Sequence, residues 1–307
     1  MTTLAPRVVV VSRRSEYDEL LARHGTRAAA AYFLGQRGRD LDEVAARHLA
    51  LRAALTEVGA AIPADWRRGH VDREDLPRFL FAPEDIVVAV GQDGLVANVS
   101  KYLDGQPVIG IDPEPGRNPG VLVPHRAADT PRLLTAVAAG AAIVQRRTMV
   151  LAELDDGQEL FGLNEVYFGH PTHQSARYIV STSDGSRERH SSSGVVVGTG
   201  TGATGWCASI ARQRADAPAL PKPQEVALCW FVREAWPSPA TGVSLTSGRL
   251  EEGEQLELIS EGERGVVFAD GVETDHLALA WGQRVSIGLA GRQLCLVSTS
   301  AAVGRRH

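Results

Sequence analysis

Two glycine-rich segments combine residue types that could bind a phosphate or move a proton. The first, GQDG at 91–94, follows an apolar run at 85–90. Glycines after a buried strand let backbone N–H groups approach a phosphate, and a helix beginning there favours anions. An acidic side chain in such a turn is unfavourable unless it takes a proton or helps hold a metal. We therefore interpret Asp93 as a candidate catalytic carboxylate, with a plain structural turn as the alternative.

The second segment reads GTGTGATGW over 198–206 and follows a run of valines. Alternating glycines and threonines between a strand and a helix favour a nucleotide cradle of backbone amides and hydroxyls. Trp206 could stack on a base or pack against the core.

Two residue pairs carry weaker signals. Asn164 and Glu165 are adjacent in LNEVYF. Neighbours on a strand face opposite sides, so both reach one ligand only at a strand end or a bulge. A solvent-facing Glu beside a turn Asn is the alternative. The pair Asp270-Gly271, which follows an apolar run, is typical of a hairpin turn.

Several histidines and an arginine lie outside these motifs. His48 lies on the apolar stripe of a helical pattern at 41–58, and we interpret it as structural. Arg177, His170 and His173 are interpreted as oligomer contacts or phosphate ligands, because a two-histidine zinc site lacks a third ligand. The three cysteines are far apart, which argues against a disulfide framework and favours a reducing compartment.

The first half of the chain alternates strand and helix patterns. Ser15 with Asp18 three residues later predicts a helix cap. This alternation predicts a mostly parallel, Rossmann-like sheet with helices on its faces. The predicted strands are 8–11, 85–90, 107–111 and a short one at 120–123, and the predicted helices are 41–58, 95–103 and 130–144.

The second half is predicted to be mainly β. Hairpin signals lie at 155–157 and 184–185, and one short helical stretch lies at 203–213. Further strands are expected at 225–232, 255–259, 265–268 and 284–287. We therefore predict an α/β domain at 1–145 and a β-rich domain at 146–289.

Length and charge narrow the function classes. The 307 residues suggest two domains, and 32 Lys and Arg against 37 Asp and Glu give a net charge of −5 with no basic block. This excludes the usual signature of a nucleic-acid binder. No apolar run is long enough for a signal peptide or a membrane helix, so we expect a cytoplasmic protein that binds a small molecule.

Taken in order, the motifs resemble the signature set of the NAD kinases. The matching segments are VAVGQDG, GLNEV, SSGVVVGTGTGATGW and the late ADG, spread over roughly residues 85 to 290. The serine-serine-glycine segment and the Trp are similar to the branch that includes the mitochondrial-type enzymes. The chain departs from the usual family forms GGDGT and TPTGSTAY, and from the acidic residue before the latter, at Gln92, Leu95, Gly200, Trp206 and Ser193.

The resemblance implies a two-domain NAD kinase-like fold whose C-terminal tail, 290–307, packs back on the first domain. It implies transfer of the γ-phosphoryl group of ATP, with Mg²⁺ or another divalent ion, to the 2′-hydroxyl of the adenosine ribose of NAD. It also implies a homodimer built through the β-rich half. The implied site residues are Asp93 as general base, Gly91, Gln92, Gly94, Thr199, Gly200, Thr201 and Gly202 for ATP and its phosphates, and Asn164, Glu165, Ser193, Thr204, Trp206 and Ser209 for NAD, with no protein metal ligand.

Two other functions are compatible with the same residues. One is a related kinase that phosphorylates a lipid, sugar or nucleoside hydroxyl. The other is a catalytically idle NAD-binding regulator, against which the retained Asp93 argues. ATP or polyphosphate as donor, and NAD or NADH as acceptor, remain open alternatives.

Overall fold

The computed structural model describes residues 5–117 and 120–298. The chain divides into two compact units. Unit 1 is Met1–Gln145 with Cys295–His307, and unit 2 is Arg146–Leu294. None of the helices in the described ranges combines the length and apolar character that crossing a bilayer requires.

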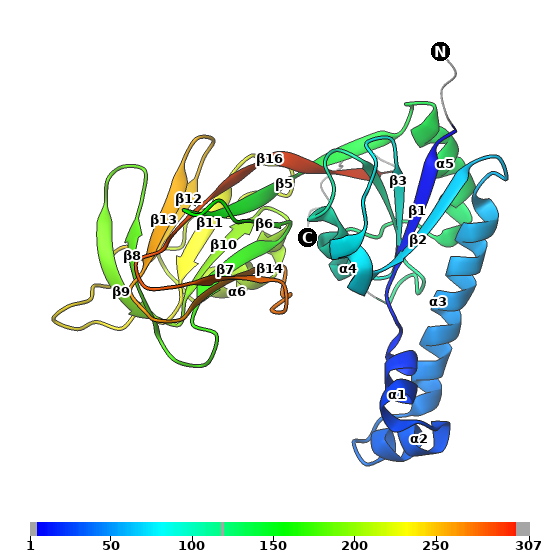
Figure 1. The fold of residues 1–307 in the computed structure, drawn as a ribbon, viewed down its shortest axis with the longest axis horizontal. Helices are drawn as coiled ribbons and strands as arrows, with labels where there is room; N and C mark the ends of the chain where they lie inside the picture. The colour runs from blue at the N-terminus through cyan, green and yellow to red at the C-terminus, as the bar shows by residue number, and fades with distance from the viewer. Residues whose placement is uncertain (1–4, 118–119, 299–307) are drawn as a thin grey trace. The chain divides into compact units, whose positions relative to one another are not determined.

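Unit 1 is built on a parallel sheet (Figure 1). The strand order is β2 (Arg67–Asp72), β1 (Arg7–Ser12), β3 (Ile86–Val90), β4 (Pro107–Ile111) and then the last residues of β16 (Arg284–Ser298). Every neighbouring pair runs parallel. β1 and β3 carry β-branched residues buried on both faces, which confirms the predicted strands. The chain leaves β1 on one side for β2 and returns on the other side for β3.

Helices cover this sheet and extend beyond it. Val58 of the longest helix and Leu134 of the last one share a buried cluster with Val88 of the sheet. The first helix begins at the capping box predicted at Ser15. The helices are α1 (Glu16–His24), α2 (Arg27–Gly35), α3 (Leu41–Ala61), α4 (Asp93–Ser100) and α5 (Thr130–Ala138), with 3₁₀ turns η1 (Arg73–Arg78) and η2 (Ala127–Asp129).

One predicted helix of unit 1 ends earlier than expected, and one predicted strand is absent from the described part of the chain. The helix expected over 130–144 ends at Ala138, because Gly140 adopts a φ of +66° that stops it, and β5 (Ile143–Leu154) follows. The short strand expected at 120–123 does not form. The backbone N–H groups of its residues donate to the Asp93 carboxylate and are not available for a strand ladder.

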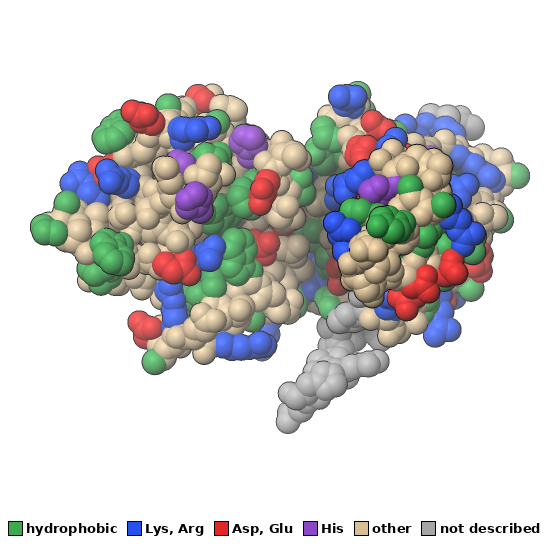
Figure 2. Space-filling model, turned by 90° about the horizontal axis from the view of Figure 1, so that it is seen from below, with side chains coloured by type: hydrophobic (Ala, Val, Ile, Leu, Met, Phe, Trp, Pro, Cys, Tyr) green, Lys and Arg blue, Asp and Glu red, His purple; other side chains and the backbone are tan. Residues whose placement is uncertain are grey.

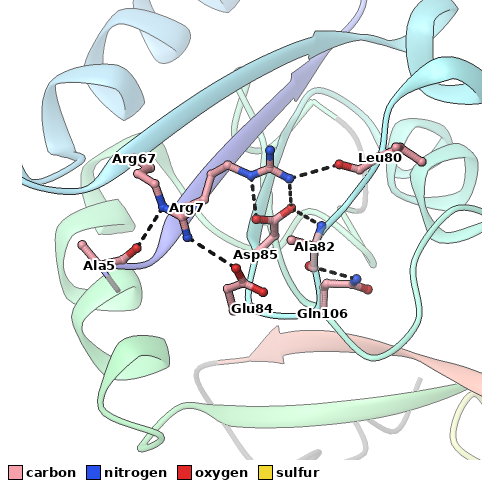
Figure 3. Close-up of polar contacts among 8 residues, drawn as sticks. All are labelled: Ala5, Arg7, Arg67, Leu80, Ala82, Glu84, Asp85 and Gln106. Carbon is pink, nitrogen blue, oxygen red and sulfur yellow. Dashed lines mark hydrogen bonds and ion pairs between the residues drawn. The ribbon is translucent and has the colours of Figure 1, made fainter. Parts of the chain in front are cut away.

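A partly buried ion pair joins β1 to the turn that precedes β3 (Figure 3). Nε and Nη2 of Arg7 donate to the two carboxylate oxygens of Asp85 at 2.7 and 2.5 Å. The Asp85 side chain is fully buried and also accepts the backbone N–H of Ala82 at 2.7 Å. Proximity and hydrogen bonding to Asp85 raise the pKa of Arg7. This paired geometry fixes the amino ends of the two central strands.

Replacing Asp85 by alanine is expected to lower the free energy of unfolding by about 3 kcal/mol, because Arg7 and the Ala82 N–H lose a buried partner. Urea denaturation followed by circular dichroism measures this change. The matched control is Asp42→Ala, since Asp42 pairs with Arg27 where both side chains are mostly exposed, 74% and 64%. That variant should lose less than about 1 kcal/mol. Equal losses would mean that the Arg7–Asp85 pair contributes no more than a surface pair.

Unit 2 is mainly β, as predicted. Its six-stranded sheet has the order β12-β11-β10-β7-β14-β15, and β16, β13, β8 and β9 form a second series to which β5 and β6 are attached through β16. Phe168, Tyr178 and Trp230 lie in the core cluster that joins strands of both series. The elements not yet bounded are β6 (Glu159–Gly162), β7 (Glu165–Gly169), β8 (Ala176–Ser181), β9 (Arg187–Ser192), β10 (Val195–Thr199), η3 (Gly202–Thr204), α6 (Trp206–Ala211), β11 (Leu228–Val232), β12 (Ser247–Leu250), β13 (Gln255–Ser260), β14 (Gly265–Ala269) and β15 (His276–Leu279).

The last strand, β16, contributes to both units. Its first residues pair with β13 in unit 2, and Cys295 and Leu296 pair with Pro107 and Val108 in unit 1. The remainder of the predicted tail, 299–307, lies outside the described residues. Figure 2 shows basic and acidic side chains interspersed over the visible face of both units.

Candidate functional site

The GQDG turn joins β3 to α4 at the carboxyl end of the parallel sheet. The N–H of Gly91 donates to the carbonyl of Ile111, which ties the turn to the neighbouring strand β4. Gln92 precedes the first residue of α4, and Gly94 faces open space where a Cβ would meet nothing within 4 Å. The helix predicted at 95–103 begins earlier, at Asp93, and also ends earlier, at Ser100. This places Gly91, Gln92 and Gly94 where a phosphate could reach the helix N-terminus.

Asp93 is held by three consecutive backbone donors. Its Oδ1 accepts the N–H groups of Leu122 and Val123 at 2.8 and 3.2 Å, and its Oδ2 accepts that of Val121 at 3.1 Å. Each carboxylate oxygen accepts about two hydrogen bonds, so Oδ2 retains capacity for one more donor. The carboxylate is thus oriented by the chain and still able to accept a proton from a ligand.

In unit 2, Thr199 organises the glycine-threonine segment. Its hydroxyl donates to the carbonyl of Leu163 at 2.5 Å and accepts the N–H groups of Thr201 and Gly202 at 3.1 and 3.3 Å. Its own N–H donates to the carbonyl of Asn164 at 2.9 Å. Thr199 is fully buried, so its side chain supports the Asn164 segment from within.

The glycines of this segment allow close backbone contacts within the protein. A Cβ on Gly202 would overlap the carbonyl of Asn164, and one on Gly200 would overlap the carbonyl of Lys222. Both residues are buried, and Thr201 is 6% exposed. Gly200, Thr201 and Gly202 therefore pack against other parts of the chain. Thr204, in contrast, is exposed, and its hydroxyl donates to the Thr201 carbonyl.

Asp270 of unit 2, like Asp93 of unit 1, accepts hydrogen bonds from three consecutive backbone N–H groups. Its carboxylate accepts the backbone N–H groups of Leu163, Asn164 and Glu165 at 3.0, 2.7 and 3.3 Å. Asp270 has a φ of +54°, in the left-handed region, at the turn between β14 and β15. The predicted hairpin turn is confirmed, and it also caps the Asn164 segment.

Glu165 is the first residue of β7, so Asn164 and Glu165 lie at a strand end, the geometry that lets both face one ligand. Burial, together with the nearby negative charge of Asp270, raises the pKa of Glu165 to about 7. Desolvation disfavours the charged form of a carboxyl group. The side chain therefore changes its charge near neutral pH, where a ligand hydroxyl could pair with either form.

This shift makes stability depend on pH with a definite sign. Glu165 binds its proton more tightly when folded than at its ordinary value of 4.5, so the free energy of unfolding should fall as pH rises from about 4.5 to about 7. The total change over this range is about 3 kcal/mol. Glu165→Gln should lose this slope in thermal unfolding measured from pH 4 to 8. The exposed control Glu159→Gln should keep it, and parallel curves for parent and Glu165→Gln would refute the shift.

Trp206, at the start of α6, contacts an aromatic ring and a guanidinium group. Its ring stacks on that of Tyr167 at 5.8 Å between centroids and 17° between planes, and the guanidinium of Arg233 lies 5.2 Å from its ring centroid. The Tyr167 hydroxyl donates to the carbonyl of Ser193 at 2.9 Å. Trp206 thus stacks on another side chain at the surface of unit 2 and is half-buried, while Ser209 is exposed on the same helix.

Comparison with known proteins identifies the fold. No protein-family model matches the chain, and no curated protein matches it in sequence. Among solved structures, it is similar to yeast NADH kinase complexed with NADH, with a TM-score of 0.60, 12% sequence identity, and coverage of 97% of this chain and 85% of that one. The fold is NAD kinase-like. This confirms the fold that the motifs predicted, whereas the mitochondrial-type branch stays a prediction.

Within this NAD kinase-like fold, the structure groups five of the ten predicted unit 2 site residues. Asn164, Glu165, Thr199, Thr201 and Gly202 lie in one hydrogen-bonded assembly. Sequence reasoning missed Tyr167, Arg233 and Phe268, which line a pocket of about 510 Å³ beside Trp206. The alternation in LNEVYF, which places Tyr167 on the same face as Glu165, is the signal that could have found the first of them.

Three further predicted residues line a second pocket of unit 2, and one of them, His170, also lines the pocket beside Trp206. His170, His173 and Arg177 line a pocket of about 730 Å³ together with Glu261 and Arg264. In the part of the chain that the structure describes, no three His, Cys, Asp or Glu side chains are placed to hold a metal ion. Magnesium is commonly bound through one or two carboxylates together with substrate phosphates, and such an ion needs no three-residue cluster of the protein.

Proposed function

We propose that the chain is an NAD kinase that transfers the γ-phosphoryl group of ATP to the 2′-hydroxyl of the adenosine ribose of NAD. The observation that carries the proposal is the likeness of the fold to yeast NADH kinase over nearly the whole chain. Asp93, which begins a helix after a buried parallel strand, supplies the candidate base. In this proposal Gly91, Gln92 and Gly94 bind phosphate through the N-terminal turn of α4.

Asp93 acts as the general base in this proposal. Its Oδ2 accepts the proton of the ribose 2′-hydroxyl, whose oxygen then bonds to the γ-phosphorus while the bond to the ADP oxygen breaks. The three backbone donors hold the carboxylate in place, which reduces the reorganisation needed during the reaction. A divalent ion bound with the nucleotide would neutralise charge on the phosphates.

Unit 2 supplies the acceptor side in this proposal. Asn164 and Glu165 bind the adenosine part of NAD, because their backbone is fixed by Asp270 and Thr199 and their side chains remain half-buried. Ser193, Thr204, Trp206 and Ser209 line the rest of the NAD site. Thr199 and Gly202 hold this backbone in position, and the ATP contacts predicted for Thr199, Gly200, Thr201 and Gly202 stay a prediction.

The deciding experiment is a coupled assay with purified protein, ATP and Mg²⁺. NADP formed from NAD, or NADPH from NADH, is measured with a dehydrogenase specific for the phosphorylated cofactor. We expect product with at least one of the two acceptors. ADP release only with a lipid, sugar or nucleoside would instead indicate another hydroxyl acceptor, and NAD binding without turnover would indicate a regulator.

We also propose that the protein works as a cytoplasmic homodimer whose contacts come from unit 2. Its short strands have edges that need pairing or cover. Light scattering should give twice the chain mass at micromolar concentration, and a fully active monomer would contradict the dimer.

A further inference from the structure

We propose that a small arginine-lined pocket in unit 1 binds the phosphate chain of the nucleotide donor, with Arg13 and Arg14 as the residues that recognise it. This inference rests on the proposed kinase function and names protein groups for the donor that the sequence motifs do not include. The pocket holds about 110 Å³ and is lined by residues that follow β1, β3 and β4 and by residues of α3.

The topology places this pocket where ligands bind in open parallel sheets. From β1 the chain crosses to β2 on one side, and β3 lies on the other side of β1. Ligands bind outside the carboxyl ends of the strands at such a reversal of strand order. Arg13 and Arg14 directly follow Ser12, the last residue of β1, and Gly91 and Gln92 follow β3, so both walls of this crevice contribute to the pocket.

The guanidinium groups of Arg13 and Arg14 are available to a ligand. Arg14 is exposed and, among the described residues, makes no hydrogen bond or ion pair. The only polar contact of Arg13 within the same ranges is a 3.3 Å hydrogen bond from Nη2 to Oε1 of Gln92, a residue of the phosphate turn. Arg47 of α3 also lines the pocket, and its Nε is buried without a hydrogen-bond partner in the described structure.

The acidic residues of the pocket are already engaged. Glu16 forms ion pairs with Arg39 at 2.6 Å and with Arg47 at 3.5 Å. These two arginines lower the pKa of Glu16 and keep it ionised. Glu114 pairs with Arg117 at 3.3 Å, and Asp112 accepts the backbone N–H of Glu114 at 2.8 Å.

His48 contributes a polar edge that is fixed in place. Its Nδ1 lies 2.8 Å from the Ser15 hydroxyl, within the capping group of α1, and 3.5 Å from the Asp18 carboxylate. The histidine interpreted from the sequence as structural is therefore both a partner of the cap and part of the pocket wall.

Size and chemistry select phosphate over other parts of a nucleotide. The pocket is smaller than the roughly 300 Å³ at which sites for whole drug-sized ligands begin, so it accepts one end of a nucleotide. Arginine forks match phosphate oxygens with paired hydrogen bonds. A glycine turn that opens a helix lies beside them, so backbone N–H groups and guanidinium groups would contact the same phosphate chain.

The test is calorimetric titration of the full chain with ATP, with inorganic tripolyphosphate and with NAD. The double variant Arg13→Gln, Arg14→Gln should bind ATP and tripolyphosphate at least about tenfold more weakly than the parent, while its affinity for NAD stays within about twofold. Both arginines are exposed, so the variant should fold normally. The control Arg23→Gln removes an exposed arginine at the other end of α1 and should bind all three ligands as the parent does.

Unchanged binding of tripolyphosphate by the double variant would overturn the inference, as would an equal loss in Arg23→Gln or a tenfold loss of NAD affinity. Loss of ATP binding with no tripolyphosphate binding by the parent would also overturn it, since the pocket would then not read phosphate. The proposed kinase function is judged separately by the coupled assay. Arginine-dependent tripolyphosphate binding in a protein that makes no NADP would uphold this inference and reject that function.

Discussion

Replacing Asp93 by asparagine is expected to lower the rate of the proposed NADP-forming reaction by about 100-fold or more, because an amide cannot take the proton that the proposed base accepts from the attacking hydroxyl. The structure adds a second consequence. An asparagine side chain offers one acceptor oxygen where the carboxylate offers two, so at least one of the N–H groups of Val121, Leu122 and Val123 loses its partner. We expect a moderate loss of stability, about 1–2 kcal/mol, beside the loss of turnover.

The two consequences can be separated by measurement. Turnover at saturating ATP and NAD reports the proton transfer, and hydrogen exchange at 121–123 reports the backbone contacts. Asp104→Asn is the matched control, because Asp104 is an exposed aspartate in the loop after α4. It should keep parental turnover. Turnover of Asp93→Asn within a few-fold of the parent would show that the carboxylate only holds the backbone.

Placing alanine at Gly202 is expected to abolish measurable NAD binding. The new methyl group would overlap the carbonyl oxygen of Asn164, a backbone atom that cannot swing away as a flexible side chain would. Relief requires the Thr199–Asn164 contacts to separate, which displaces the residues proposed to hold adenosine. Overpacking of this kind typically lowers stability by about 1–3 kcal/mol. Because the displaced backbone carries the proposed NAD contacts, we expect the loss of NAD affinity to be larger than this stability cost alone.

Gly205→Ala provides the comparison within the same loop. A Cβ on Gly205 would meet only the Gly202 carbonyl, at an ordinary 3.6 Å. Its NAD affinity, measured by calorimetry, should equal that of the parent, and both variants should be checked for folding by circular dichroism. If Gly202→Ala binds NAD as Gly205→Ala does, the close approach of the two segments is not needed for the site.

Local sequence patterns correctly predict the helices, strands and turns that are determined by their own residues. The valine run of β1 and the apolar run of β3 predict buried parallel strands, and Ser15 predicts the cap of α1. The GQDG turn is located correctly between β3 and α4, because a pair of glycines directly after a buried strand is typical of a turn that leads into a helix. Here hydrophobic pattern and turn chemistry point to the same element.

Contacts between distant segments could not be predicted in this way. Asp270 accepts hydrogen bonds from the backbone N–H groups of Leu163, Asn164 and Glu165, more than one hundred positions earlier in the chain. No local sequence pattern predicts such a contact. The strand expected at 120–123 is wrong for the same reason: its apolar residues satisfy a β pattern, but their N–H groups go to Asp93. The role of Gly202 likewise depends on a backbone that the sequence does not place beside it.

The course of β16 has a consequence for biosynthesis. During translation the sheet of unit 1 is made as far as β4, and the whole of unit 2 follows before Cys295 and Leu296 emerge to pair with Pro107 and Val108. His125 already bridges the carboxyl end of this edge at Ile111, but until then Pro107 and Val108 at the start of β4 remain without a strand partner on this side, and open apolar edges invite pairing with other chains. Co-translational folding would leave unit 1 incomplete while unit 2 can already assemble its own strands. The newly made chain therefore needs its last strand, β16, to complete the edge of the unit 1 sheet at β4, a strand that is synthesised much earlier.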